Sequence, residues 1–272
     1  MRYLRLAVVL LFLISVGGVA YTVHTISTRD VTSPVITAEY DEIHMSVNDN
    51  QEILFDGLSA IDDRDGDITD QIILERISRF SEIGVCQVSF VVFDKENNLG
   101  RYQRTLYYDD YTAPRLHFDK PMLYYTAENI SAFDGIRLFD CIDGDISHKL
   151  KLEASNVVAS VPGIYEVELA AVTNYGDEIR VRVPLNVIDY SADAPVITLD
   201  KYLVYTKKGQ SVDPLTYVSS VTDSKGNEMN IADIKVSNQV DFSKEGSGQI
   251  LLEFTNSDGI TGVTYLTVIV EA

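Results

Sequence analysis

The sequence is poor in the residues that build catalytic and metal sites. Its 272 residues include two cysteines and four histidines, and no tryptophan. The histidines form no H-x-x-x-H or H-E-x-x-H pairing, so zinc has little support, and neither G-x-S-x-G nor a phosphate-binding glycine loop occurs. We therefore expect no enzymatic activity and no cofactor, and we assign no catalytic or cofactor-binding residue. The histidines are His24, His44, His117 and His148.

Positive charge is also scarce, with 22 lysines and arginines against 41 aspartates and glutamates and a formal net charge of −19. A nucleic-acid backbone needs clustered lysine and arginine, and the sequence has no basic patch, so we expect no nucleic-acid partner. Hydrophobic residues make up 46% of the chain, which is enough to fill the cores of one to three domains. The 16 tyrosines and 10 phenylalanines favour β-sheets.

A long apolar run occurs at the N-terminus. Arg2 and Arg5 precede the uncharged segment Leu6–Val23, whose 18 residues would form a helix of about 27 Å at about 1.5 Å per residue. Positive charge on the N-terminal side of the segment predicts that the residues after it lie outside the cell. We therefore expect a signal anchor that crosses the membrane once and leaves the C-terminal region extracellular.

A cleaved signal peptide is the alternative interpretation of this segment. Leu6–Val16 would then be its apolar core and Gly18-Val19-Ala20 its cleavage site. The uncleaved anchor is preferred because the apolar run continues past Ala20. Both interpretations export residues 30–272, and they differ in whether the product stays on the membrane or is secreted.

Three copies of one pattern fill the rest of the chain. Ser33-Pro34-Val35-Ile36 recurs as Ala113-Pro114-Arg115-Leu116 and as Ala194-Pro195-Val196-Ile197, with the prolines 80 and 81 residues apart. Asp65-Gly66-Asp67 recurs as Asp143-Gly144-Asp145, 78 residues later. Copies of about 80 residues with short strands and frequent turns are typical of small β-sandwiches.

The strands of each copy alternate apolar and polar residues. In the second copy Tyr165, Val167 and Leu169 share one face, whereas Glu166 and Glu168 take the other. This period of two predicts half-buried antiparallel hairpins with one face on a core. The inward-facing residues expected in the other copies are Cys86, Val88, Phe90 and Val92 in the first, and Ile250, Leu252 and Phe254 in the third.

The whole series, from the leading proline through Asp-Gly-Asp to a hairpin with a polar turn, resembles the bacterial immunoglobulin-like domains found in tandem on Gram-positive surface proteins. The same domain type is appended to certain pesticidal crystal toxins. The resemblance covers residues 32–272, and in the third copy Val221–Asn227 replaces the Asp-Gly-Asp signature. It implies an all-β fold of three tandem immunoglobulin-like β-sandwiches, placed outside the cell and without enzymatic activity.

The predicted organisation follows from the apolar run and the repeats. Residues 1–31 would hold the signal anchor, with its span at about 6–23, and a short linker. Residues 32–110 and 111–190 would form the first two immunoglobulin-like domains, and residues 191–272 a degenerate third.

The stretch Ser59–Ile72 is the most suggestive chemically, because four aspartates lie within six residues. Calcium binds six to eight oxygens, often from closely spaced carboxylates, so these four are candidate calcium ligands. A turn is the alternative, since aspartates accept backbone N–H groups and glycine supplies a positive φ. The four candidates are Asp62, Asp63, Asp65 and Asp67.

The spacing favours the turn. A helix-loop-helix calcium site that began at Asp63 would place Ile68 where that site needs glycine and Leu74 where it needs glutamate. We therefore assign no metal site. We interpret the repeated motif as a structural turn signature formed by Asp65, Gly66 and Asp67 and by Asp143, Gly144 and Asp145.

The remaining candidates are cysteines, tyrosines and a glycosylation sequon. Cys86 falls on a core face and Cys141 on the second aspartate turn, so we expect no disulfide and a buried Cys86. A bacterial host would normally ignore the sequon Asn129-Ile130-Ser131. Because adjacent strand residues point to opposite faces, we expect one tyrosine of each close pair to be exposed, where it could stack on a sugar or pack on a partner. Strand propensity with packing between domains is the alternative for these pairs, which are Tyr107-Tyr108, Tyr124-Tyr125 and Tyr202/Tyr205.

These features predict a non-enzymatic, membrane-anchored extracellular protein that acts as a spacer or as a protein-interaction or adhesion module. A carbohydrate- or cell-wall-binding module is the alternative, and it would need a concave surface with clustered tyrosines and polar groups. The partner is an unknown protein or glycan in either case.

Overall fold

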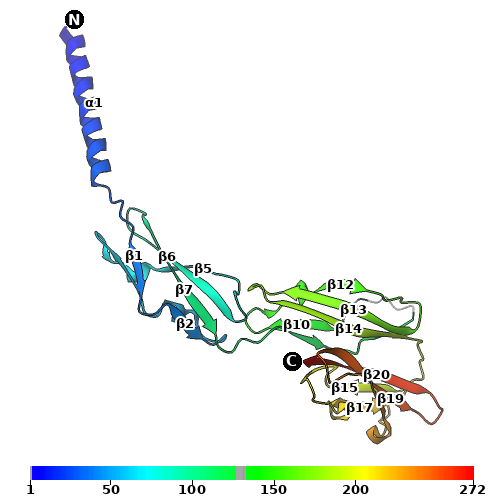
Figure 1. Ribbon diagram of the computed structural model, residues 1–272. Helices are drawn as coiled ribbons and strands as arrows, with labels where there is room; N and C mark the ends of the chain where they lie inside the picture. Colours follow the sequence, from blue (N-terminus) through cyan, green and yellow to red (C-terminus); the bar gives the residue numbers. More distant parts are fainter. Residues whose placement is uncertain (1, 127–130, 132) are drawn as a thin grey trace. The chain divides into compact units, whose positions relative to one another are not determined.

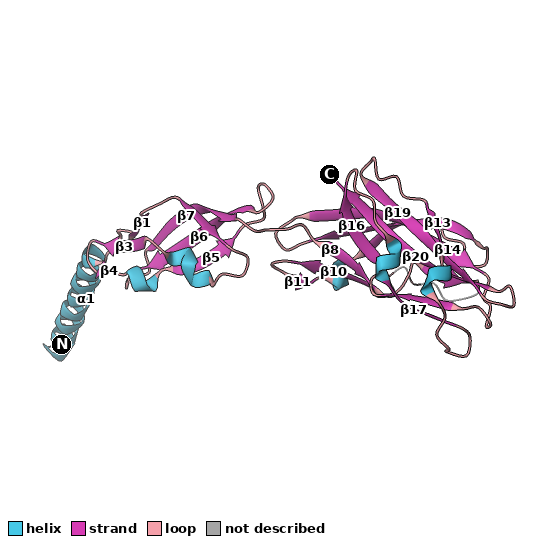
Figure 2. Ribbon diagram, turned by 90° about the horizontal axis from the view of Figure 1, so that it is seen from below, coloured by secondary structure: helices cyan, strands magenta, loops and turns pink. Residues whose placement is uncertain are grey.

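The computed structural model describes residues 2–126, 131 and 133–272, so Asn129 of the sequon lies outside the described residues. The chain begins with the helix α1 (Arg2–Thr28) and continues as strands (Figure 1). Figure 2 shows that strands dominate the rest of the chain, with a few short 3-10 helices between them. The fold is therefore nearly all-β, with several sheets and one N-terminal apolar helix. It divides into two compact units, residues 1–109 and 110–272.

The helix α1 contains the predicted apolar segment and continues past it. Residues 5–28 are long and apolar enough to cross a membrane, and none of this helix is buried inside the protein. At about 1.5 Å per residue these 24 residues measure about 36 Å, against a hydrocarbon core of about 30 Å. The hydroxyls of Thr22, Thr25 and Thr28 donate to carbonyls three or four residues earlier, so the last turns satisfy their polar side chains within the helix.

The first unit contains two sheets. The smaller one has the strand order β1 (Val35–Ala38), β3 (Leu58–Asp62), β4 (Gly66–Asp67). The larger one has the order β2 (Glu42–Met45), β7 (Leu99–Tyr108), β6 (Val85–Phe93), β5 (Ile73–Ile77). Two 3-10 helices connect the strands: η1 (Gln51–Phe55) and η2 (Thr69–Gln71).

The two sheets of the first unit enclose one core. The four residues predicted to face inward on β6 are all 0% exposed, which confirms the alternation read from the sequence. They share this core with Ile36 of β1 and Ala60 of β3, so residues of both sheets meet in it as they do in a β-sandwich.

The described residues of the second unit form four sheets. Two are small, with the orders β11 (Gly144–Asp145), β10 (Ile136–Asp140), β8 (Arg115–Phe118) and β15 (Val196–Leu199), β17 (Val218–Thr222). One four-stranded sheet has the order β12 (Lys151–Ser155), β13 (Gly163–Val172), β14 (Glu178–Ile188), β9 (Leu123–Tyr125). The other has the order β16 (Leu203–Lys207), β20 (Thr261–Glu271), β19 (Gly246–Thr255), β18 (Lys235–Asn238). The 3-10 helices are η3 (Ser147–Lys149), η4 (Pro214–Tyr217) and η5 (Ile231–Asp233).

Two hydrophobic cores fill the second unit, and they are in contact. Leu203 of β16 belongs to the core built mainly by residues 116–187, and Ile269 packs against it. Ile250, Leu252 and Phe254 lie in the other core, each at most 3% exposed, as the alternation predicted. Residues from both sides of position 190 thus share one core, and the division into three domains stays a prediction.

Each repeat contains a parallel strand pair that the sequence did not reveal. β2 pairs in parallel with β7, β9 with β14 and β16 with β20, whereas the hairpin strands pair antiparallel as expected. The first two strands of a repeat lie in different sheets, so they do not pair with each other as a hairpin. The second strand pairs instead with the last strand of the repeat, and the two run in the same direction.

Two of the prolines that open a repeat lie against a glycine. A Cβ atom added to Gly100 would lie 2.2 Å from the carbonyl oxygen of Pro34, and one added to Gly262 would lie 1.8 Å from that of Pro195. Only glycine permits this approach of the opening segment to the last hairpin strand.

Candidate functional site

The first aspartate turn is built by side chains that accept backbone N–H groups. Asp62 ends β3, and its Oδ1 accepts from the backbone nitrogens of Arg64 at 3.0 Å and Asp65 at 2.8 Å. Asp67 Oδ1 accepts from the backbone nitrogen of Thr69 at 3.0 Å. Hydrogen bonds from Thr69 lower the pKa of Asp67, so this carboxylate stays ionised and acts within its own turn.

Asp65 reaches a different loop. Its carboxylate accepts from the backbone nitrogen of Lys95 at 2.8 Å and from Lys95 Nζ at 2.7 Å, which joins the turn to the connection between β6 and β7. Hydrogen bonds from Lys95 lower the pKa of Asp65. In the second copy Asp143 accepts in the same way from the backbone nitrogen and Nδ2 of Asn174, at 2.7 and 3.0 Å. Gly66 and Gly144 have φ of +77° and +71°, the left-handed region that favours glycine.

The four candidate calcium ligands therefore point to different places. Asp63 is exposed, Asp65 pairs with Lys95, and Asp67 bonds within its turn. Asp62 is buried and lies in a separate cluster with Asp30 and Asp94 (the buried aspartate cluster).

The buried aspartate cluster joins three segments of the first unit that are distant in sequence. Asp30 follows α1, Asp62 ends β3, and Asp94 follows β6. One carboxylate oxygen from each lies within 4.8 Å of the other two, and the three residues are 1%, 4% and 6% exposed. No short-range motif links positions 30, 62 and 94, and for this reason the sequence did not reveal the cluster.

Hydrogen bonds satisfy only part of this cluster. Both oxygens of Asp94 accept from Asn98, at 2.7 Å from its backbone nitrogen and at 2.6 Å from Nδ2. Asp30 Oδ1 accepts a backbone N–H, and its Oδ2 lies 3.3 Å from Arg64 Nε without making a hydrogen bond. Asp62 Oδ2 is buried and has no hydrogen-bond partner. Of the three buried carboxylates, Asp30 lies beside a guanidinium and Asp62 keeps one oxygen without a donor, an arrangement that is costly unless further positive charge is supplied.

In the second copy the aspartate that corresponds to Asp62 has a hydrogen-bond donor. Asp140 corresponds to Asp62, since each stands three residues before the Asp-Gly-Asp motif. The hydroxyl of Tyr111 lies 3.1 Å from Asp140 Oδ2 and 2.9 Å from Asp177 Oδ2. Burial, together with the hydrogen bond to Asp177, raises the pKa of Tyr111 well above its usual range, so this hydroxyl keeps its proton. A protonated donor therefore reaches Asp140 Oδ2 in the second copy, whereas Asp62 Oδ2 in the first copy has no hydrogen-bond partner.

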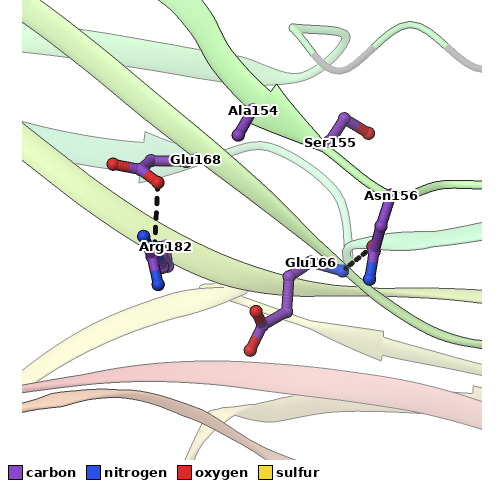
Figure 3. Close-up of a pocket in the computed structure, with 6 residues that line it drawn as sticks. All are labelled: Ala154, Ser155, Asn156, Glu166, Glu168 and Arg182. Atoms are coloured by element: carbon purple, nitrogen blue, oxygen red, sulfur yellow. Dashed lines mark hydrogen bonds and ion pairs between the residues drawn. The ribbon is translucent and has the colours of Figure 1, made fainter.

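Glutamates and an arginine line a hollow of about 210 Å³ on the second unit (Figure 3). It lies over β12, β13 and β14. Glu168 bonds to Arg182 Nε at 2.9 Å and to Arg180 Nη1 at 3.2 Å, and these two arginines lower the pKa of Glu168. Because Glu168 is held ionised, it is unsuited to act as a general acid, and the volume is below the range of about 300–1,000 Å³ usual for ligand pockets.

A larger hollow of about 360 Å³ combines aromatic and basic side chains on the same unit. Arg115 lies over the ring of Tyr205 at 4.3 Å, and Tyr205 Oη accepts from the backbone nitrogen of Leu116 at 2.8 Å. Phe139, which lines the hollow, is 40% exposed. The hollow is lined by Arg115, Leu116, His117, Phe139, Lys201, Leu203, Val204, Tyr205 and Tyr217.

Two histidines contact aspartates, but both pairs are exposed to solvent. His44 Nδ1 is 2.8 Å from Asp109, with side chains 57% and 61% exposed, and His117 Nε2 is 3.2 Å from Asp119, with side chains 42% and 46% exposed. Solvent screens such pairs, so they resemble surface contacts rather than the oriented dyads of hydrolases.

The tyrosine pairs differ from the expectation of one exposed ring in each. Tyr124 is buried and the other five rings are half-buried, because they pack on neighbouring elements. Tyr107 stacks on His44 with ring centres 4.7 Å apart, and Tyr125 packs edge-on against Tyr190 at 5.1 Å. Packing within the fold therefore describes these tyrosines better than stacking on a sugar does.

Both cysteines are unpaired. Cys86 is 0% exposed, as predicted, and burial raises its pKa to about 11. Cys141 is partly exposed, and its Sγ donates to the carbonyl oxygen of Thr112 at 3.3 Å.

Comparisons with known sequences give distant relatives. No protein-family model matches the chain. The pesticidal crystal protein Cry22Aa of Bacillus thuringiensis is 26% identical over 254 residues, which are 88% of this chain and 32% of that protein. An uncharacterized 81.3 kDa protein of Acholeplasma phage L2 is 21% identical over 181 residues, 63% of this chain and 24% of that protein. The chain thus spans a third or less of the length of these relatives.

Similar solved structures are still more distant. CBM51-2 in complex with GlcNAc, with INT domains, from Clostridium perfringens ZmpB is 14% identical, with a TM-score of 0.25, and the match covers 55% of this chain and 26% of that one. Drosophila N-cadherin EC1-4 is 12% identical, with a TM-score of 0.22, and the match covers 88% of this chain and 76% of that one. At such TM-scores the assignment of function has to come from this chain's own residues.

Proposed function

We propose that the chain is a non-enzymatic, membrane-anchored extracellular protein, whose immunoglobulin-like repeats act as a spacer or as a protein-interaction or adhesion module. The observation that carries the proposal is the helix α1. Residues 5–28 form a long helix of high mean hydropathy, none of which is buried inside the protein, so a hydrocarbon environment suits it. Arg2 and Arg5, at the N-terminal end of this helix, favour an orientation with the strands outside the cell.

The described side chains support a role without catalysis. Glu168 is held ionised by two arginines, and the two histidine–aspartate pairs are solvated. Asp65 bonds to Lys95 of a neighbouring loop, and Asp67 bonds within its own turn. A general acid or base needs a shifted pKa in a closed site, and these groups lie on open surfaces or serve the turns.

Membrane fractionation of the full chain tests the anchor. The chain, with a C-terminal epitope, would be expressed in a Gram-positive host, and membranes would be extracted with alkaline carbonate. We expect the native chain to resist extraction and external protease to remove the epitope from intact cells. Two arginines in the span, Leu11→Arg and Ile14→Arg, should release it from membranes, because each charge at the centre of a span costs about 3 kcal/mol.

The matched control places the same two arginines on an exposed loop, as Val158→Arg and Val161→Arg, where both native side chains are about half exposed. This control should fractionate like the native chain. Complete release of the native chain into the medium would favour the cleaved signal peptide, and an epitope protected in intact cells would contradict the topology.

Carbohydrate or cell-wall binding is the second candidate, and the larger hollow favours it. Its volume of about 360 Å³ lies within the usual range for ligand sites. Phe139 offers a partly exposed aromatic side chain, while Arg115 and Lys201 carry N–H donors.

Co-sedimentation of the solubilised chain with isolated cell walls tests this second candidate. Saturable binding that Phe139→Ala weakens at least about fivefold would support it. Phe93→Ala is the matched control, because Phe93 is 43% exposed on the first unit and should leave wall binding unchanged. Equal binding by both variants, or none by the native chain, would leave the spacer or protein-interaction role as the better account.

A further inference from the structure

We propose that Asp30, Asp62 and Asp94 bind a calcium ion, which fastens the segment after α1 to the first unit. This site differs from the aspartate turn considered from the sequence, since it keeps Asp62 and excludes the other three aspartates of that turn. The proposal goes beyond the anchor and spacer role and does not depend on it.

The spacing of the carboxylates suits one shared ion. Calcium lies about 2.3–2.6 Å from its oxygen ligands, so two oxygens on the same ion are separated by no more than about 5 Å. One oxygen from each aspartate falls within 4.8 Å of the others. Magnesium demands a strict octahedron at about 2.0–2.1 Å and gives up its waters reluctantly, so a cluster of three buried carboxylates suits it less well.

The burial of Asp62 Oδ2 points to a missing positive partner. This oxygen is buried and has no hydrogen-bond partner, while Asp62 Oδ1 is fully used by two backbone N–H groups. A buried carboxylate oxygen without a donor is costly, and structures avoid it unless a water, an ion or a function compensates. Calcium would supply the charge that the cluster lacks.

Arg64 supplies only part of that charge. Its Nε lies 3.3 Å from Asp30 Oδ2 without making a hydrogen bond, and its Nη1 donates to the carbonyl oxygen of Thr28 at 2.7 Å. The Arg64 side chain is 52% exposed, so it can turn toward solvent when an ion takes its place. Water entering on that exposed side would complete the six to eight oxygens that calcium requires.

The second copy provides an internal comparison. There the Tyr111 hydroxyl reaches both Asp140 and Asp177, so Asp140 Oδ2 has a donor that Asp62 Oδ2 lacks. The phenol fills the place that an ion would take, and we therefore assign calcium to the first copy and not to the second.

Calcium would change how the anchor is joined to the first unit. Asp30 stands two residues after α1, and an ion shared with Asp62 and Asp94 would tie it to the ends of β3 and β6. Without the ion, mutual repulsion among three carboxylates would loosen this segment.

Calcium titration of the full chain in detergent micelles tests the proposal. Terbium luminescence, sensitised by tyrosine, and its displacement by calcium would report binding. Extracellular calcium sites bind in the range of about 10⁻⁴–10⁻³ M, so 10 mM calcium should raise the thermal midpoint of the first unit by about 5 °C or more over EDTA. Magnesium should give a smaller shift.

Asp62→Asn is the decisive variant, because asparagine keeps the Oδ1 acceptor for the turn and removes only the charge. It should lower calcium affinity at least about tenfold and abolish the thermal shift. In EDTA it should be at least as stable as the native chain, since an unpartnered buried charge is gone. If Asp62 had only a structural role, Asp62→Asn would not lose the calcium shift while keeping its stability in EDTA.

Asp140→Asn is the matched control at the corresponding turn of the second copy, and it should retain the full calcium shift of the first unit. The proposal is overturned if calcium leaves the thermal midpoint of the native chain unchanged, if Asp62→Asn keeps the shift, or if magnesium acts as strongly as calcium.

Discussion

Asn186 Nδ2 donates to Gln249 Oε1 at 2.6 Å, and the two residues are only 1% and 2% exposed. Asn186 lies on β14 in the second copy and Gln249 on β19 in the third. Gln249 Nε2 in turn donates to the carbonyl oxygen of Pro184 at 3.0 Å. Because a buried amide is costly unless it is paired, this bond fixes how these two strands meet within the second unit.

Replacing one partner of this pair should destabilise the second unit. Gln249→Leu leaves the Asn186 amide buried without its acceptor, and we expect it to lower the free energy of unfolding by about 2 kcal/mol. Adding Asn186→Leu should cost less than the sum of the single changes, because no orphaned amide remains. Urea denaturation followed by tyrosine fluorescence measures both effects. Gln87→Leu, at an exposed side chain that donates to Thr105, is the control; strict additivity would argue against the pair.

A methyl group at Gly262 should disturb the third copy. The Cβ of Gly262→Ala would lie 1.8 Å from the carbonyl oxygen of Pro195, so backbone has to move. We expect a loss of about 2–3 kcal/mol in the free energy of unfolding. Gly163→Ala, whose Cβ would meet only ordinary contacts at 3.5 Å, is the matched control. Equal stability of the two variants would show that the close approach is relaxed in solution.

The two cysteines should differ in reactivity. Cys86 is buried with its pKa raised to about 11, so the thiol is both inaccessible and protonated at pH 8. Alkylation with iodoacetamide, counted by mass spectrometry, should modify Cys141 alone in the folded chain and both cysteines in urea. Rapid modification of Cys86 without urea would mean that the first core opens readily.

Acid should remove the contribution of Glu168 to stability. Arg180 and Arg182 lower the pKa of Glu168 from its ordinary value of 4.5, so its stabilising effect is complete above about pH 4.5 and is lost as the pH falls through the lower folded value. Glu168→Gln should therefore destabilise the chain at pH 7, with the difference from the native chain shrinking below pH 4.5. Glu166→Gln, at an exposed neighbour, is the control. A difference that stays constant with pH would rule out the ion pairs as its cause.

Features carried by local patterns could be predicted from the sequence. Period-two alternation placed Val88 and Leu252 in their cores, and the apolar run predicted the helix. The helix nevertheless ends at Thr28, beyond the predicted span, and the hydroxyl of Thr28 bonds back to the helix backbone.

Features that depend on distant residues could not be predicted in this way. Asp30, Asp62 and Asp94 meet only after the strands have paired, and no spacing rule connects them. Arg104 occupies an inward position of β7 and is 1% exposed, donating to the carbonyl oxygen of Asp56 at 2.9 Å. A charged residue at such a position interrupts the apolar alternation, and its backbone acceptors, the carbonyls of Asp56 and Leu54, are 48 and 50 residues away.

Cysteine labelling in intact cells tests the central claim, which is that α1 anchors an exported chain. In a Cys141→Ser background, which keeps the buried Cys86, one further cysteine would be added at a time, as Tyr3→Cys before the span or as Ser257→Cys on an exposed turn of the third copy. A membrane-impermeant maleimide should label position 257 in intact cells and position 3 only after lysis. Labelling of position 3 alone in intact cells, or of neither position until lysis, would contradict the account.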